Sequence, residues 1–214
     1  MRTTIILSVA VALMMTVANA ALITGNPGSW AGSDGEAAQY GWCPVFENIT
    51  VGDPGGGQAY QAESVTLTVW GATSEFSAYL LPGTVVAGDF WDNRGSAIAT
   101  GTLGGPFGAD AAHATTVTVT FNTPAVLAAG KYYLELWPGG DAKGLTYARD
   151  GGTNSYPGGE EAYLNGAPSP WQVGVNANYD LVFRLDGTVV PVPEPATLAL
   201  LGLGGLAALL RRRR

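Results

Sequence analysis

Aromatic and carboxylate side chains gather in one stretch, residues 137–171, of this 214-residue chain. Aromatic rings can stack on the C–H faces of sugars while neighbouring carboxylates and amides hydrogen-bond the hydroxyls. A long polar loop on a rigid scaffold is where such a site forms. The alternative is that these aromatics fill the end of a hydrophobic core. The candidate glycan contacts are Trp137, Tyr147, Tyr156, Tyr163 and Trp171.

Glu160 and Glu161 raise the question of glycosidase chemistry, which uses two carboxyl groups roughly 5–10 Å apart. Adjacent residues on a strand point to opposite faces, so this pair does not flank one bond. Asp150 and Asp180 are the remaining candidate partners. The chain has no Gly-x-Ser-x-Gly elbow for a nucleophilic serine. We therefore predict that the chain is not an enzyme and keep a glycoside-active enzyme as an alternative.

The single histidine and the single cysteine offer no metal or redox chemistry. His113 has no second histidine and no cysteine cluster to complete a metal site. Cys43 excludes an internal disulfide, and we expect a small buried residue rather than a reactive or intermolecular thiol. We predict no cofactor and no metal.

The charge distribution excludes nucleic acid as a partner. Residues 21–190 hold 16 acidic and 5 basic residues, a net charge of −11, whereas the whole chain has −7 because the remaining arginines lie at its ends. Such a domain repels a phosphate backbone. No acidic run has the spacing of an EF-hand loop.

The elements that would position these side chains are short strands. In residues 65–70, 115–121 and 131–137 apolar residues alternate with threonine or other polar residues, which predicts half-buried strands. Turns rich in Gly, Pro, Asn and Asp separate the runs, and no helical period appears within the domain. The sequence predicts one all-β domain over residues 21–190, a β-sandwich of jelly-roll type. Residues 21–64 are expected to be mostly irregular, and the predicted strands are 45–51, 65–70, 75–81, 97–103, 115–121, 131–137 and 179–185.

Residues 1–20 have the pattern of a secretory signal peptide. Arg2 precedes an apolar run over residues 5–17, and the small residues Ala18 and Ala20 mark a cleavage site before Ala21. We expect export through the general secretion machinery.

The last residues of the sequence combine three features. Pro193, Glu194 and Pro195 form an extended segment, because proline restricts its own φ and the conformation of the preceding residue. Residues 196–210 carry no charge and predict a short transmembrane helix of roughly 22 Å. Four arginines then mark the cytoplasmic end of the helix. These stop residues are Arg211, Arg212, Arg213 and Arg214.

This tail resembles the PEP-CTERM sorting signal of bacteria. In that family a Pro-Glu-Pro motif, here residues 193–195, precedes a transmembrane helix and a basic cluster. The resemblance implies recognition by an exosortase, a membrane-embedded cysteine transpeptidase, with cleavage near the motif and only transient anchoring through residues 196–210. An ordinary tail anchor that is never processed is the alternative.

The domain itself resembles domains of bacterial surface proteins. The likeness is carried by residues 121–124, 129–133, 156–159 and 180–184 together with Trp171. We expect a membrane-anchored precursor that ends at the cell surface or outside the cell, with a non-catalytic structural or adhesive role in an exopolysaccharide matrix, biofilm or floc. A carbohydrate-binding module that uses the loop aromatics is the alternative role.

Overall fold

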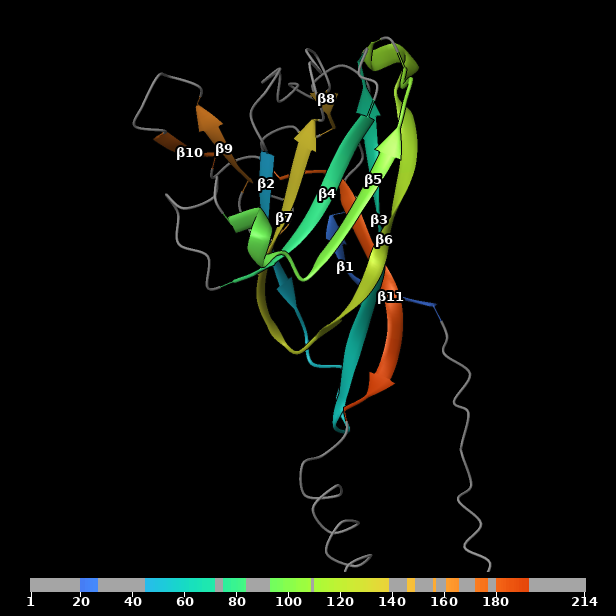
Figure 1. The fold of residues 1–214 in the computed structure, drawn as a ribbon, viewed down its shortest axis with the longest axis vertical. Helices are drawn as coiled ribbons and strands as arrows, with labels where there is room; N and C mark the ends of the chain where they lie inside the picture. The colour runs from blue at the N-terminus through green and yellow to red at the C-terminus, as the bar shows by residue number, and fades with distance from the viewer. Residues whose placement is uncertain are drawn as a thin grey trace, which may run out of the picture.

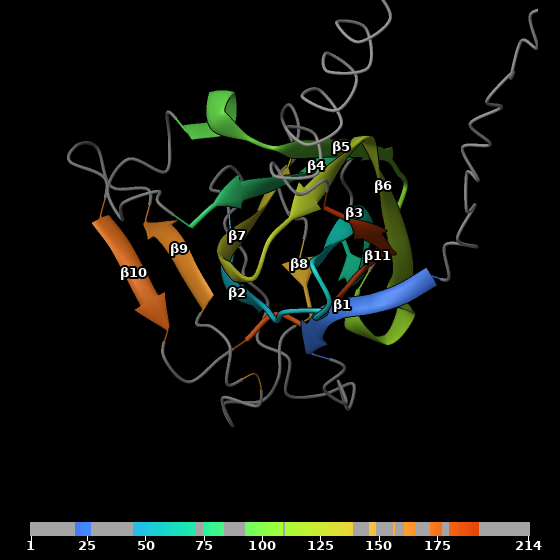
Figure 2. The same cartoon turned by 90° about the horizontal axis from the view of Figure 1, so that it is seen from below.

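Two antiparallel sheets face each other around one hydrophobic core. The computed structural model describes residues 20–26, 45–71, 75–83, 93–108, 110–138, 146–148, 156, 161–165, 172–176 and 180–192. All regular elements in these ranges are strands, apart from the 3-10 turns η1 (Asn93–Ser96) and η2 (Ala111–His113). Figures 1 and 2 show the two layers from the side and from below. The prediction of an all-β domain is confirmed, and the jelly-roll type stays a prediction.

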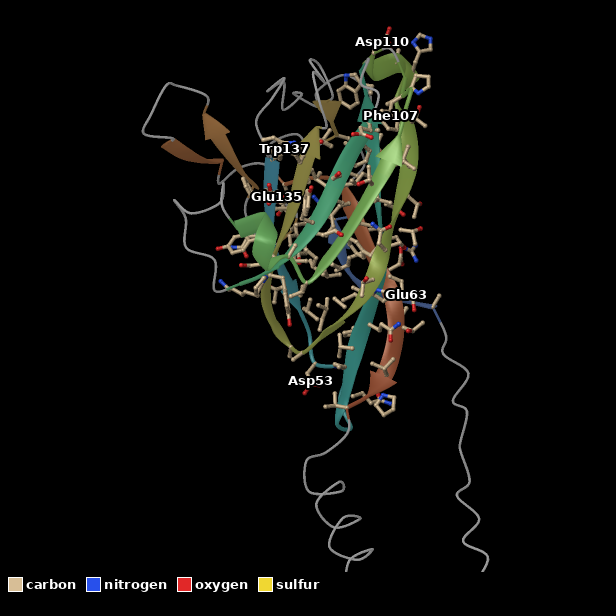
Figure 3. The ribbon with its side chains drawn as sticks, in the orientation of Figure 1. Asp53, Glu63, Phe107, Asp110, Glu135 and Trp137 are labelled. Carbon is tan, nitrogen blue, oxygen red and sulfur yellow. The ribbon has the colours of Figure 1, made fainter. Side chains whose placement is uncertain are left out.

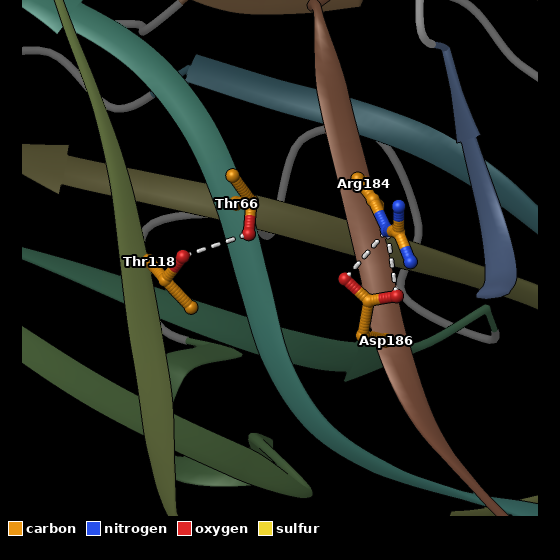
Figure 4. Close-up of polar contacts among 4 residues, drawn as sticks. All are labelled: Thr66, Thr118, Arg184 and Asp186. Atoms are coloured by element: carbon orange, nitrogen blue, oxygen red, sulfur yellow. Dashed lines mark hydrogen bonds and ion pairs between the residues drawn. The ribbon is translucent and has the colours of Figure 1, made fainter. Parts of the chain in front are cut away.

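The first sheet joins the two ends of the domain. Its order is β1 (Ala20–Asn26), β11 (Phe183–Pro191), β3 (Gln58–Trp70) and β6 (Thr115–Leu127), and the short β8 (Thr146–Tyr147) also pairs with β3. The outer face of this sheet is polar because threonines alternate with apolar residues along β3 and β6. Thr66 bonds Thr118 across the strands at 2.9 Å, and Arg184 donates to Asp186 at 2.7 Å beside them (Figure 4).

The second sheet carries the candidate aromatic residues of β7. Its order is β10 (Gln172–Asn176), β9 (Glu161–Asn165), β2 (Val45–Val51), β7 (Gly130–Pro138), β4 (Glu75–Pro82) and β5 (Ala99–Gly104). Apolar residues of β4 and β7 alternate so that one face of each strand is buried against the first sheet. Phe76, Ala78 and Leu80 of the predicted strand 75–81 are fully buried there, and Leu134 and Leu136 lie in the same core.

The two sheets meet along one side of the molecule, where β5 packs against β6 (Figure 2). Gly101 of β5 permits this approach, because a Cβ at this position would collide with the backbone oxygen of Thr120. A sheet edge that is covered in this way offers no free strand for pairing with another chain.

Periodicity located most strands that contribute to the core and missed the first strand and the short strands late in the chain. The predicted strand 45–51 is β2, and the predicted runs 65–70 and 115–121 are parts of the longer β3 and β6. The expectation of mostly irregular chain over residues 21–64 was wrong at both ends of this range, since β1 pairs with β11 from Ala20 onward and β3 begins at Gln58. The last strand was predicted too early in the sequence, at residues 179–185, because β11 begins only at Phe183 and continues to Pro191. β8, β9 and β10 were not predicted.

Both predicted targeting segments lie almost wholly outside the described residues. Of the predicted signal peptide only Ala20 is described, and the predicted transmembrane helix 196–210 is not described at all. Within the ranges given above, no helix is long and apolar enough to cross a bilayer.

Candidate functional site

Tyr147 lies in the core. Its side chain is 2 % exposed and stands edge-on to Phe76, with ring centroids 6.1 Å apart. The hydroxyl is buried and has no hydrogen-bond partner among the residues that the structure describes. Burial raises the pKa of Tyr147 well above its ordinary value, because the interior disfavours the phenolate. For this residue the structure favours core filling over glycan contact.

We predict that Tyr147→Phe leaves the fold at neutral pH equally stable or more stable by about 1 kcal/mol, since a buried hydroxyl without a partner is costly. The raised pKa adds a pH dependence. The folded protein holds the phenol proton of Tyr147 more tightly than the unfolded chain does. The free energy of unfolding is therefore not reduced by this group below the ordinary pKa of 10.0, and it falls as the pH rises above that value. Urea unfolding at pH 7 and above pH 10 should therefore show a smaller alkaline loss in the variant.

Tyr132→Phe is the contrasting control, because the Tyr132 hydroxyl donates to the Ala128 oxygen at 3.0 Å. Its removal should slightly lower stability at neutral pH. A loss of more than about 1 kcal/mol at pH 7 from Tyr147→Phe would show that the Tyr147 hydroxyl has a partner.

Tyr156 connects the two sheets on the side opposite β5 and β6. Its hydroxyl lies 2.7 Å from the Thr24 hydroxyl of β1 and accepts from the backbone N–H of Thr50 in β2 at 3.0 Å. The ring is 7 % exposed and meets Phe183 edge-on at 5.4 Å. Core filling again accounts for the residue better than glycan contact does.

Trp137, one of the predicted glycan contacts, has a partly exposed side chain. It lies on β7 and is half-buried, and Figure 3 places it beside Glu135 on the same strand. Tyr163 belongs to β9, where its backbone pairs with Val45. Trp171 lies outside the described residues. The structure does not bring the five predicted residues together as one surface site.

A different set of aromatics shares one face with Trp137. Strand register places Tyr79 of β4 opposite Glu135 of β7, and Tyr133 and Trp137 flank Glu135 on the same face. Tyr79, Tyr133 and Trp137 are half-buried, whereas Glu135 is fully buried. Sequence reasoning missed Tyr79 and Tyr133 because it looked for the site in a loop. The alternation along residues 131–137 places Tyr133 on the face of Trp137.

Two buried carboxylates accept hydrogen bonds from backbone N–H groups that are distant in the sequence. Glu47 Oε2 accepts from the backbone N–H of Leu181 at 2.9 Å, and Asp180 Oδ2 accepts from that of Tyr156 at 2.9 Å. Glu47 and Asp180 are 0 % and 1 % exposed. Asp180, considered above as a partner for Glu160 or Glu161, is therefore committed to a backbone hydrogen bond inside the fold.

His113 pairs with a single carboxylate at the surface. Its Nδ1 lies 2.6 Å from Asp110 Oδ1, and both side chains are largely exposed. The hydrogen bond from His113 lowers the pKa of Asp110. In the described part of the chain, no group of three or more His, Cys, Asp or Glu residues is arranged to hold a metal ion.

The last described residues lead directly into the predicted sorting tail. Pro191 is the final residue of β11 and pairs with Gln58 of β3. The N–H of Val192 donates to the Gly57 oxygen at 3.0 Å. Pro193 follows immediately in the sequence, so a single residue separates the last strand from the Pro-Glu-Pro segment.

Comparison with known proteins identifies this tail. Residues 191–214 match the family described as the PEP-CTERM protein-sorting motif. No curated protein and no solved structure matches the chain. The predicted sorting signal is thus confirmed, and it implies an exported protein that an exosortase processes from a membrane-anchored precursor to a surface form.

Proposed function

We propose that this PEP-CTERM protein is a structural or adhesive component of the cell surface or extracellular matrix, without catalytic activity. The observation that carries the proposal is the junction of a compact two-sheet domain with a sorting motif after a single residue. Such an arrangement delivers the folded domain to the outside of the membrane as one unit.

The outer face of the first sheet supports a role in contact with neutral, hydroxylated polymers. Cross-strand pairs place threonine opposite threonine at Thr66–Thr118 and Thr68–Thr116. Their hydroxyls bond one another at 2.9 and 3.3 Å, and they retain further hydrogen-bonding capacity toward solvent. A face lined with hydroxyl groups is chemically suited to hydrogen-bonding an exopolysaccharide. The negative charge of the domain neither attracts nor repels such a polymer if the polymer is neutral.

Fractionation of the producing cells tests this proposal. The processed domain should be recovered with the exopolysaccharide matrix, and intact mass should show a chain that begins at Ala21 and lacks Arg211 to Arg214. Recovery of the processed domain only as free protein in the medium would contradict a matrix role. Recovery of unprocessed chain in cells with an active exosortase would contradict processing itself.

Carbohydrate binding is the second candidate function, favoured by the half-buried aromatic set Tyr79, Tyr133 and Trp137. Aromatic rings that keep part of their surface in contact with solvent can stack on the apolar faces of sugars. We predict that Trp137→Ala weakens retardation of the secreted domain in a gel containing the host exopolysaccharide by about tenfold in apparent Kd, a typical cost of losing one stacking residue.

Tyr132→Ala is the matched control, because Tyr132 lies on the same strand and packs against the core on the opposite face. It should leave the retardation unchanged. Equal retardation of the Trp137 variant and the unmodified domain would eliminate this face as a glycan site.

A further inference from the structure

The ends of β3 and β11 form a narrow projection, here called the β3–β11 arm (residues 52–60 and 189–192). The pairing of β1 with β11 begins at Ala20 and Thr188, and the pairing of β6 with β3 ends at Leu127 and Tyr60. Beyond these positions, among the residues that the structure describes, only β3 and β11 continue, with Ala59 opposite Val190 and Gln58 opposite Pro191. Figure 1 shows these strand ends extending past the rest of the domain.

The tip of the arm is small and nearly uncharged. Gly55, Gly56 and Gly57 have φ of 82°, 63° and 69°, a left-handed run that favours glycine at all three positions. Asp53 Oδ1 stabilises the turn by accepting from the Gly55 N–H at 2.7 Å. Asp53 is the one charged residue in the arm, although the domain as a whole is strongly acidic.

The arm runs directly into the sorting motif, because Pro193 follows Val192. Two residues, Val192 and Pro193, separate Pro191 from Glu194, and three steps of extended chain span at most about 10 Å. A protein surface that recognises a peptide is wider than this, since specific interfaces contain about 20–30 residues on each side. An enzyme that encloses Glu194 therefore also meets the arm as long as β11 remains paired.

We propose that the β3–β11 arm lies beside the membrane-embedded processing enzyme when the enzyme encloses Glu194, and that the slim, glycine-tipped shape of the arm supplies the steric clearance that allows the folded domain to be processed without a linker. The inference rests on the proposed exosortase processing of this chain. Small residues at the tip avoid steric conflict with the enzyme. The low charge of the arm also keeps the acidic body of the domain away from anionic headgroups.

The test adds bulk to the arm of the full-length chain and follows processing by pulse–chase and intact mass. Gln58→Trp places a large side chain at an exposed strand position opposite Pro191. We expect processing to slow by about tenfold or more, because a small displacement of a reacting group has effects of that size. Asn122→Trp is the matched control at an exposed position of β6, and its processing should stay within about twofold of the unmodified chain.

A second variant separates a steric effect from misfolding. Inserting six residues of Gly and Ser between Val192 and Pro193 should restore processing of the Gln58 variant, because the motif then reaches the enzyme independently of the arm. Normal processing of Gln58→Trp, or failure of the linker to restore processing of this variant, would overturn the proposal of steric clearance. Absence of processing in the unmodified chain would instead contradict the proposed function.

Discussion

Cells that produce the Glu194→Ala variant should accumulate the full-length precursor, with its arginine tail still attached, at the membrane. The two flanking prolines are retained in the variant, so the change removes the carboxylate and keeps the backbone restrictions that proline imposes. A hydrogen bond to a charged group contributes about 1.5–3 kcal/mol. Its loss corresponds to release that is slower by roughly tenfold or more.

Intact mass of the envelope and medium fractions measures this result directly. Glu75→Ala is the control, since it removes an exposed glutamate of β4 far from the tail in the sequence. Both variants should be exported and fold alike. Release of the Glu194 variant at the normal rate would show that the carboxylate plays no part in recognition of this tail.

Glu47→Ala should destabilise the domain by about 3 kcal/mol or more. Glu47 shares the inner face of β2 with Val45, Ile49 and Val51, and it is fully buried. Truncation leaves the buried N–H of Leu181 without its acceptor and opens a cavity, and each effect costs about 1–3 kcal/mol. Urea unfolding of the secreted domain provides the measurement.

Glu47→Gln and Glu75→Ala complete this experiment. Glutamine retains an oxygen that can accept from Leu181, so the loss should be smaller than with alanine. The exposed Glu75 should change stability by less than about 0.5 kcal/mol. Equal stability of the Glu47→Ala variant and the unmodified domain would mean that the carboxylate does not hold Leu181 in place.

The sequence predicted the interior of the fold well because burial imposes alternation. Val65, Leu67 and Val69 are all buried in β3, and Leu181, Phe183 and Leu185 are buried near the other end of the chain, as their spacing indicated. Strand ends were less predictable. β3 begins at Gln58, seven residues before the alternating run that starts at Val65. The residues between them, which include Gln61 and Glu63, show no clear alternation of apolar and polar side chains.

The terminal strand β1 carried little local signal. β1 is held by pairing with β11, which is distant in the sequence, and Leu22 on this edge is 53 % exposed. Such a strand forms because a neighbouring strand is available for pairing. The periodicity of its own residues does not reveal which distant strand that will be.

The candidate site was predictable only in part. The sorting motif could be recognised because a few residues in a fixed order carry its chemistry. The aromatics of residues 137–171 could not be divided between core and surface, because tyrosine suits both environments. Tyr147 and Tyr156 are buried, while Trp137 remains partly exposed. Glu47 gave no signal at all, since a lone glutamate in a strand normally points to solvent.

The pairing of the first strand with the last one sets the order of events during export. On the export route that the sequence predicts, β1 reaches the outside first and its partner β11 follows every other described strand. β1 then waits without this partner until the end of translocation. The first sheet can close only when the sorting tail after Pro191 is next to cross, so we expect the domain to finish folding beside the membrane.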